Sequence, residues 1–451
     1  MTQKTKFHFR CLKCNYIIKD FKEWFEHNQS CPVCKHKFVF TEYEKPSSDV
    51  KALIDDKNYT KHDLWRYFDF LPLNDRANII SSEEGAVPVD KWDFLKDFAK
   101  KQYNVDIDVF AFRNDLNKGT GTFKDPAGSV AASVLKECGI TEYCIASTGN
   151  IANAYAHYLA KAGISISVFI PQDALMANEA EVNSYAQRIY RVKGDYAAAK
   201  KIAAEYNGKY NILLSGGNID PMRVEAKKTM VFEWMRLMDK MPTVYIQALS
   251  GGTGPIAIDK AYHDLKGTGL LGELPRFLMI QPDQCAPMTQ GYRKSKANGF
   301  PEGWLNDYPI IESPITAVPT LATGNPGSYP IIADLVRKSN GEMLEFDEKA
   351  IVDVARLIAY ETHVSVGPAA CIAIGGFFEA LHHGKLNNGD TVLINVGEGV
   401  RRAPKLMEEL IYTTQHISSI DEVKPFNRSD YRAKLWEPFL EYDKIAIEKT
   451  R

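Results

Sequence analysis

Lys124 stands between a loop rich in glycine and threonine, residues 119–122, and the dipeptide Asp125-Pro126, which favours the start of a helix. The positive end of a helix lowers the pKa of a nearby lysine, so that a larger fraction of its amine is free. A free amine can attack the aldehyde of a cofactor and join it covalently. A solvated surface lysine fits the same residues, so this loop alone leaves both interpretations open.

A second loop, Ser147-Thr148-Gly149-Asn150, lies between an apolar segment and an alanine-rich one. Backbone N–H groups and small hydroxyls at the N-terminus of a helix bind an anion such as a carboxylate. Serine, threonine and asparagine also cap helices when no ligand is present. The loop therefore predicts either a carboxylate site or a simple helix cap.

A third loop consists of Ser250, Gly251, Gly252, Thr253 and Gly254, and it also follows an apolar segment. Successive glycines allow several N–H groups to converge on a phosphate, and the hydroxyls add further donors. The loop lacks the Gly-Lys-Ser/Thr ending of a P-loop and the G-x-G-x-x-G pattern of a dinucleotide turn. A flexible turn is the alternative interpretation.

Four of the eight cysteines form two closely spaced pairs near the N-terminus, Cys11-x2-Cys14 and Cys31-x2-Cys34. Two such pairs suit tetrahedral zinc, and the metal would supply most of the stability of so small a segment. Disulfides are the alternative, although they rarely persist in a reducing compartment. Lysines and aromatic residues around the cysteines could grip nucleic acid, but acidic neighbours dilute the charge, which favours a structural role.

Short apolar segments alternate with alanine-rich, helix-like segments over most of the chain. This alternation predicts crossover units and a mostly parallel sheet, and hence the α/β class. Ligands bind such sheets at the carboxyl ends of strands, where the loops described above are expected. The expected strands are residues 141–146, 164–171, 188–192, 210–215, 243–249, 276–282 and 390–396, and the expected helices include residues 151–163 and 196–208.

The chain has 451 residues, of which 45% are hydrophobic and 25% charged, and its net charge is −2. These values are typical of a globular protein with more than one domain. The small net charge argues against a chain that coats nucleic acid or a membrane surface. No apolar run reaches about 18 residues and no signal-peptide core is present, so we expect a cytoplasmic protein.

Taken together and in this order, the loops resemble those of the fold-type II pyridoxal-phosphate enzymes, and among these threonine synthase and cysteate synthase. Some members of that family have an N-terminal four-cysteine zinc ribbon. The resemblance extends from about residue 1 to 405. Its motifs are Phe123-Lys124-Asp125, the Ser147 and Ser250 loops, Ser215-Gly216-Gly217-Asn218, Arg223-Val224-Glu225 with Lys227, Thr323-Gly324-Asn325-Pro326, and Glu361 through Pro368-Ala369-Ala370.

The resemblance implies a cofactor, pyridoxal 5'-phosphate, and a role for several residues around it. Lys124 would be joined to the cofactor aldehyde and would move protons at the substrate's alpha and beta carbons. Asn150 would hydrogen-bond the cofactor's ring oxygen. The cofactor phosphate would be held by Ser250, Gly251, Gly252, Thr253 and Gly254.

The resemblance also implies a substrate site. Ser147, Thr148 and Gly149 would hold the substrate's carboxylate. A leaving phosphate needs cations, and Arg223 and Lys227 lie four residues apart, on one face of a helix. A solvated helix face is the alternative interpretation for these two side chains.

The sequence departs from the family pattern where the pyridine nitrogen usually meets a hydroxyl. The last strand continues into Val396-Gly397-Glu398 and offers no hydroxyl there, so Glu398 is the expected partner and Asn395 the alternative. Further departures are Pro126 after Phe-Lys-Asp and Gly367-Pro368-Ala369-Ala370 in place of Glu-Pro-Ala-Ser. Because these changes fall where substrates are selected, they place threonine formation in doubt.

We therefore expect a lyase or transferase of amino-acid biosynthesis that removes phosphate from an O-phosphorylated amino acid and adds a small nucleophile. Beta-replacement on phosphoserine is favoured, and threonine synthase chemistry on phosphohomoserine is the alternative. A nucleic-acid-binding ribbon joined to an inactive enzyme-like body is an alternative of another class. The expected partners are the two small substrates and a second copy of the chain in a homodimer, with no nucleic acid and no membrane.

The expected fold is a two-subdomain body of the tryptophan synthase beta type behind an N-terminal four-cysteine zinc ribbon. The ribbon, with ligands Cys11, Cys14, Cys31 and Cys34, is expected at residues 1–42, followed by a linker at 43–62. The catalytic body is expected at residues 63–414, with a smaller subdomain at about 130–240. The last segment, 415–451, has Trp436 and Phe439 at helical spacing and is expected to be a packing or subunit-contact tail.

Overall fold

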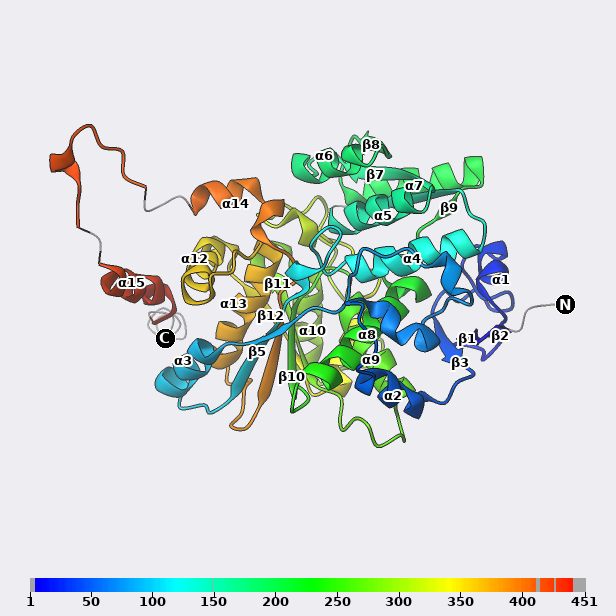
Figure 1. Ribbon diagram of the computed structural model, residues 1–451, viewed down its shortest axis with the longest axis horizontal. Helices are drawn as coiled ribbons and strands as arrows, with labels where there is room; N and C mark the ends of the chain where they lie inside the picture. The colour runs from blue at the N-terminus through cyan, green and yellow to red at the C-terminus, as the bar shows by residue number, and fades with distance from the viewer. Residues whose placement is uncertain (1–4, 148, 411–413, 426, 441–451) are drawn as a thin grey trace.

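The computed structural model describes residues 5–147, 149–410, 414–425 and 427–440. Its named strands form three sheets of three, six and four strands (Figure 1). The two larger sheets are parallel except at one edge, where β4 runs antiparallel to β5. The predicted crossover architecture is therefore present, since parallel neighbours require a connection over the sheet face.

The six-stranded sheet forms the centre of the larger part of the body. Its strand order brings β10, β13 and β5 side by side, and these three strands precede the loops that the sequence singled out. In spatial order the strands are β12 (Glu342–Phe346), β11 (Arg276–Pro282), β10 (Val244–Ala248), β13 (Thr391–Asn395), β5 (Asp108–Phe112) and β4 (Val89–Lys91).

The four-stranded sheet lies within the range predicted for the smaller subdomain, residues 130–240. Here β6 and β9 are neighbours, so the loops that follow them also lie together. In spatial order the strands are β8 (Arg188–Val192), β7 (Ser165–Pro171), β6 (Glu142–Ala146) and β9 (Leu213–Leu214).

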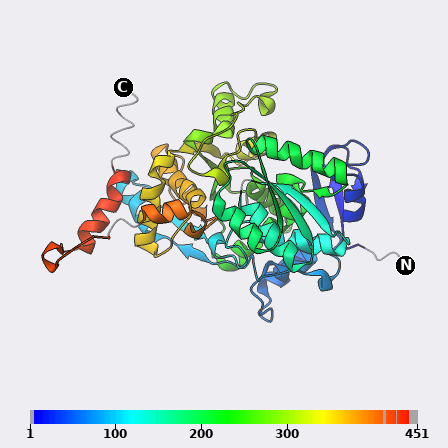
Figure 2. The same cartoon turned by 90° about the horizontal axis from the view of Figure 1, so that it is seen from above.

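The N-terminal ribbon, residues 5–43, is a three-stranded antiparallel sheet with one short helix. It consists of β1 (Phe7–Cys11), β2 (Ile17–Ile18), α1 (Phe21–Glu26) and β3 (Val39–Tyr43). Its aromatic side chains Phe7, Phe9, Phe21 and Trp24 are buried, so they pack inside the protein instead of forming a stacking surface. The ribbon and the C-terminal helix α15 lie at opposite ends of the molecule in both views (Figures 1 and 2).

Helices cover the sheets. They are α2 (Val50–Asp55), α3 (Asp93–Tyr103), α4 (Asp125–Glu137), α5 (Asn150–Lys161), α6 (Met176–Ser184), α7 (Tyr196–Tyr210), α8 (Pro221–Leu237), α9 (Thr253–Asp264), α10 (Pro287–Ala297), α11 (Tyr329–Lys338), α12 (Ile351–Thr362), α13 (Pro368–His382), α14 (Pro404–Glu409) and α15 (Arg428–Leu440). Of these helices, α4, α8 and α13 are buried on nearly all sides. Among the described residues, no helix combines the length and apolar character needed to span a membrane.

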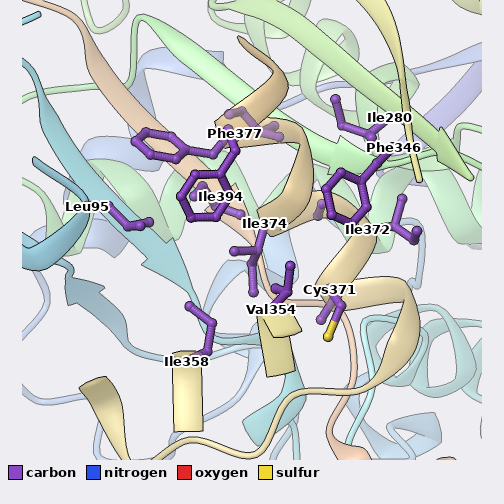
Figure 3. Close-up of a cluster of buried hydrophobic side chains, with 14 of the residues drawn as sticks. Leu95, Ile280, Phe346, Val354, Ile358, Cys371, Ile372, Ile374, Phe377 and Ile394 are labelled. Carbon is purple, nitrogen blue, oxygen red and sulfur yellow. The ribbon is translucent and has the colours of Figure 1, made fainter. Parts of the chain in front are cut away.

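Alternation along the strands divides the core of the six-stranded sheet into two layers. Ile246, Ile280 and Ile394 point to the layer formed with α3, α12, α13 and α15. Their neighbours in sequence, such as Tyr245 and Leu393, point to the layer formed with α8, α9, α10 and α11. Figure 3 shows the first layer, in which the side chains of α13 pack against the sheet. Burial of each such side chain contributes roughly 1.5–3 kcal/mol, so the sheet rigidly supports the loops at its carboxyl edge.

The segment expected to be a linker, residues 43–62, is more ordered than that interpretation implies. It contains α2, and the side chains of Val50 and Ile54 are buried in the core layer shared with α8 and α9. These two apolar residues lie four positions apart, which places them on one helix face. The charged residues around them masked this signal in the sequence.

The C-terminal segment packs on the body through α15, in line with a packing role. Its Leu435 and Phe439 are buried in the core layer of α12 and α13. The ring of Trp436 stacks on Phe98 with 5.0 Å between ring centroids, and Phe439 stacks on Phe378 at 4.3 Å. The domain boundaries as such stay a prediction.

Candidate active site

Five parallel strands from the two larger sheets end at one cavity of about 380 Å³. The loops after β5, β13 and β10 approach it from the six-stranded sheet, and the loops after β6 and β9 approach it from the four-stranded sheet. Most of the predicted site residues line this cavity: Lys124, Ser147, Gly149, Asn150, Arg223, Lys227, Ser250, Gly251, Gly252, Thr253 and Glu398. Gly254 belongs to the first turn of α9 behind the loop, and Thr148 lies outside the described residues.

Lys124 is placed by the residue that follows it. Lys124 occupies the position just before the first residue of α4. The buried carboxylate of Asp125, at the start of the helix, accepts hydrogen bonds from the backbone N–H groups of Thr120 and Thr122, each at 2.9 Å. These bonds fold the preceding loop back onto the helix terminus. Burial raises the pKa of Asp125 to about 7, because an ionised carboxyl is costly away from water. The loop and α4 thereby fix the start of the lysine side chain.

The amine of Lys124 is buried, and its pKa is lowered to about 8. Burial is the main cause, Arg223 lowers the pKa further, and the carboxylate of Glu398 opposes both effects. The sequence predicted this direction from the helix terminus, and the loss of water on burial acts in the same direction. A sizeable fraction of the amine is therefore uncharged near pH 8.

Asn150 and Glu398 come from opposite sides of the cavity and are hydrogen-bonded to each other. Asn150 is the first residue of α5, and its amide nitrogen donates to one carboxylate oxygen of Glu398. The other carboxylate oxygen accepts from the backbone N–H of Ala369 at 3.0 Å. The amide oxygen of Asn150 is buried with no hydrogen-bond partner, which leaves one acceptor in the cavity unsatisfied.

The Ser250–Thr253 loop is tightly packed against neighbouring side chains. A side chain at Gly251 would lie 1.8 Å from the Asn218 amide, and one at Gly254 would lie 2.0 Å from Gln247 Oε1. The hydroxyl of Thr253 donates to Asn218 Oδ1 at 3.1 Å. The backbone therefore approaches the cavity at the N-terminus of α9, where only glycines fit.

Arg223 and Lys227 both face the cavity from α8, as their spacing predicted, and both are buried. The guanidinium of Arg223 donates to Tyr155 at 3.1 Å and to the hydroxyl of Ser215. The amine of Lys227 lies 4.1 Å from the ring centroid of Phe123. Its pKa is lowered well below the usual value, first by burial and then by the charges of Lys124 and Arg223.

Basic side chains outnumber acidic ones in the cavity lining. Its cationic side chains are Lys124, Lys200, Arg223 and Lys227, and among the described lining residues Glu398 is the one acid. Clustered cations with few counter-charges are costly unless an anion joins them. The sequence gives no signal for Lys200, because it lies in an alanine- and lysine-rich helix that resembles a solvated one.

The loop after β6 turns by a local hydrogen-bond pair. The hydroxyl of Ser147 accepts from the N–H of Gly149 at 3.0 Å and donates to the carbonyl of Gly149 at 3.1 Å. This turn directs the loop to the N-terminus of α5, at the cavity wall. The position agrees with the predicted anion site, which stays a prediction because the same hydroxyl also serves the turn itself.

The four N-terminal cysteines gather at a separate point in the ribbon. Their sulfur atoms all lie within 4.8 Å of one another. The sulfurs of Cys11 and Cys34 are 3.5 Å apart, and so are those of Cys14 and Cys31. None of the four is in a disulfide. In a tetrahedral zinc site with Zn–S bonds of about 2.3 Å, sulfurs are separated by roughly 3.8 Å, which these distances approach.

Comparison with known proteins agrees with the geometry of the cavity. The family model described as pyridoxal-phosphate dependent enzyme matches residues 80–397. The chain belongs to this family. The predicted family membership and the assignment as an enzyme are thereby confirmed.

The curated relatives include both kinds of enzyme that the sequence resembles. A threonine synthase of Methanocaldococcus jannaschii is 26% identical over 398 residues, which cover 87% of this chain and 92% of that protein. A cysteate synthase of Methanothrix thermoacetophila is 28% identical over 293 residues, which cover 63% of this chain and 68% of that protein.

Solved structures of the same architecture share little sequence with this chain. A cysteine synthase from Entamoeba histolytica superimposes with a TM-score of 0.57 at 14% identity, covering 79% of this chain and 94% of that one. The threonine deaminase isoform 2 of Solanum lycopersicum superimposes with a TM-score of 0.56 at 16% identity, covering 76% of this chain and 87% of that one. At these identities the likeness shows the fold alone, and it confirms the predicted fold class.

Proposed function

We propose that this pyridoxal-phosphate dependent enzyme removes phosphate from an O-phosphorylated amino acid and replaces it with a small nucleophile. The observation behind the proposal is that Lys124, Arg223 and Lys227 line the same cavity as a separate glycine loop. The glycine loop suits the phosphate of the cofactor, and the two cations of α8 then remain for a second phosphate. The threonine synthase and cysteate synthase relatives support this assignment.

The residues of the cavity fit pyridoxal 5'-phosphate. The backbone at Gly251, Gly252 and Gly254, where an added side chain would clash, leaves room for a phosphate at the N-terminus of α9. The free amide oxygen of Asn150 shows that polar groups here lack a partner. Lys124 supplies a buried amine that is largely uncharged above pH 8, as attack on an aldehyde requires.

The cofactor would supply the electron sink that stabilises negative charge at the substrate's alpha carbon. Lys124 would hold it covalently and, once released by the substrate, would take up the alpha proton and return it. Its lowered pKa suits this alternation, because a base and an acid of comparable strength are needed near neutral pH.

Asn150 and Glu398 would face the ring of the cofactor. The Asn150 amide would turn from Glu398 to the ring oxygen, and Glu398 would then be free to accept from the ring nitrogen. The present contact between the two side chains means that one of them must reorient when the cofactor binds. A carboxylate at the ring nitrogen keeps that nitrogen protonated and strengthens the electron sink.

The substrate would be oriented by its two anionic ends. The N-terminus of α5, with Ser147 and Gly149, would hold the carboxylate. Arg223 and Lys227 would bind the phosphate and neutralise it as it leaves. Substrate phosphate would restore the charge of Lys227, whose pKa is depressed by burial and by neighbouring cations.

The favoured substrate is phosphoserine, with phosphate lost from the beta carbon. The departures at Glu398 and at Pro368-Ala369-Ala370 support it, because Ala369 contacts Glu398 at the cavity wall. Phosphohomoserine is the second candidate, favoured by the similarity to threonine synthase over 87% of the chain. That reaction requires a second proton abstraction at the beta carbon, which Lys124 would also perform.

The decisive experiment measures phosphate release by the purified, cofactor-loaded enzyme from phosphoserine and from phosphohomoserine, with and without sulfite as nucleophile. We expect rapid release from one substrate, and a Lys124→Ala variant should release none. Release from neither substrate by an enzyme whose visible spectrum responds to both would reject the phosphate leaving group while preserving the cofactor assignment.

We further propose that the four-cysteine cluster binds one zinc ion, which would stabilise the ribbon. Zinc there would have four protein ligands and no open position, which suits a structural ion. The homodimer and the cytoplasmic location stay predictions. The alternative of a nucleic-acid-binding ribbon also stays a prediction, although Phe7, Phe9, Phe21 and Trp24 pack inward.

A further inference from the structure

One polar contact joins the ribbon to the wall of the cavity. Gln29 follows α1 at the ribbon's surface, yet it is 7% exposed, because it inserts against residues 213–218, which comprise β9 and the start of the loop after it. Its amide nitrogen donates to the carbonyl oxygen of Leu214, and its amide oxygen lies over Gly216, where a side chain would approach to 2.7 Å. Gln29 thus lies against the residues on both sides of Ser215.

The loop of residues 213–218 in turn holds two parts of the cavity. The hydroxyl of Ser215 accepts a hydrogen bond from the guanidinium of Arg223. At the other end of the loop, Asn218 accepts from Thr253 at 3.1 Å and lies directly behind Gly251. Residues 213–218, whose backbone Gln29 contacts, therefore hold Arg223 through Ser215 and Thr253 through Asn218.

A second contact from the ribbon reaches the same helix by another route. The hydroxyl of Tyr43 donates to Glu225 at 2.8 Å, and Glu225 lies on α8 between Arg223 and Lys227. Glu225 belongs to a buried network with Lys228, Lys260 and Asp264, which joins α8 to α9. Both contacts lead from the ribbon to the cationic end of the cavity.

We propose that Gln29 is a positioning residue for the anion-binding end of the cavity: it fixes the loop of residues 213–218, and Ser215 of that loop orients Arg223. The inference rests on the proposed function, in which Arg223 binds the substrate's phosphate. It gives the ribbon a role in substrate binding in addition to its role in stability. Loss of the Gln29 amide leaves the Leu214 carbonyl without its partner, so the loop moves and Arg223 loses its orientation.

The test compares Gln29→Ala with Asn28→Ala. The two residues are neighbours, and both have positive φ angles, 55° and 50°, so the backbone strain of alanine is matched. Asn28 is exposed, whereas Gln29 is buried. A Gln29→Met variant keeps the length of the side chain and removes only the amide, which separates the hydrogen bond from packing.

The readout is the calorimetric affinity of inorganic phosphate for the enzyme loaded with pyridoxal phosphate, at equal cofactor content. We expect the affinity to fall about tenfold in both Gln29 variants, as loss of one buried hydrogen bond implies, and to stay within about twofold in Asn28→Ala. The value of kcat/KM for the phosphorylated substrate should fall by at least the same factor, because Arg223 also neutralises the phosphate as it leaves. Equal phosphate affinity in Gln29→Ala and the unaltered enzyme would overturn the proposal.

Hydrogen exchange separates this proposal from the proposed function. Amides of residues 213–218 should exchange faster in Gln29→Met than in Asn28→Ala, whatever ligand the cavity takes. If the unaltered enzyme binds no phosphate, the proposed function fails, and exchange alone then decides on Gln29. Unchanged exchange in these amides would show that Gln29 does not hold the loop.

Discussion

The glycine loop offers a prediction whose size follows from the structure. Gly252 has φ +77°, and a side chain there would lie 2.4 Å from Ile332 Cδ1. Gly267 has nearly the same φ, +80°, and a Cβ added there would meet nothing within 4 Å. Alanine in this left-handed conformation costs roughly 1–2 kcal/mol at either site. At Gly252 the clash of the added methyl group with Ile332 raises this cost by roughly a further 1–3 kcal/mol.

The consequence for the cofactor differs between the two sites. Relief of the contact with Ile332 would push the backbone N–H groups of the loop away from the phosphate position. Gly252→Ala should therefore raise the Kd of pyridoxal phosphate at least about tenfold, which corresponds to about 1.4 kcal/mol. Gly267→Ala should lose stability and keep its cofactor affinity. Titration of each cofactor-free variant with pyridoxal phosphate, followed by visible absorbance, measures the two Kd values. Equal Kd values in folded Gly252→Ala and Gly267→Ala would refute the reasoning.

Three further predictions concern charge and metal. Lys124 is protonated below its pKa of about 8, so capture of pyridoxal phosphate should speed up as pH rises through that value. Glu398→Gln should move this midpoint to lower pH, because Glu398 raises the pKa of Lys124; an unmoved midpoint in stopped-flow traces contradicts this. Lys228→Met leaves two buried carboxylates with one remaining lysine and should reduce the free energy of unfolding by about 3–5 kcal/mol. The control is Lys294→Met, which removes the exposed ion pair between Lys294 and Asp307 and should cost less than about 1 kcal/mol. Equal losses of unfolding free energy for the two variants in urea titrations would argue against the buried network. Elemental analysis should find zinc bound to the ribbon, and Cys14→Ser should reduce both metal content and melting temperature, whereas a metal-free native protein excludes the site.

Local patterns in the sequence predicted the strands best where burial and turn signals agree. The expected strands at 188–192 and 276–282 match β8 and β11 in both bounds. The strand expected at 210–215 is reduced to Leu213–Leu214, because α7 extends to Tyr210 and ends with Asn211 in the left-handed conformation. Propensity alone did not reveal how far that helix runs.

The candidate site could be predicted loop by loop, but its internal contacts could not. Each loop follows a strand, so its place at the sheet edge follows from topology. The contact between Asn150 and Glu398 joins residues 248 positions apart and depends on how two sheets face each other. Gln29 likewise gives no signal in the sequence, since a glutamine after a short helix is usually exposed.

The covalent attachment of the cofactor tests the central claim most directly. The cavity contains two buried amines with lowered pKa values, Lys124 and Lys227, and we assign attachment to Lys124 alone. Borohydride reduction of the loaded enzyme, followed by peptide mapping, should find the added mass on the peptide that contains Lys124. Added mass on Lys227, or on neither peptide, would contradict this assignment.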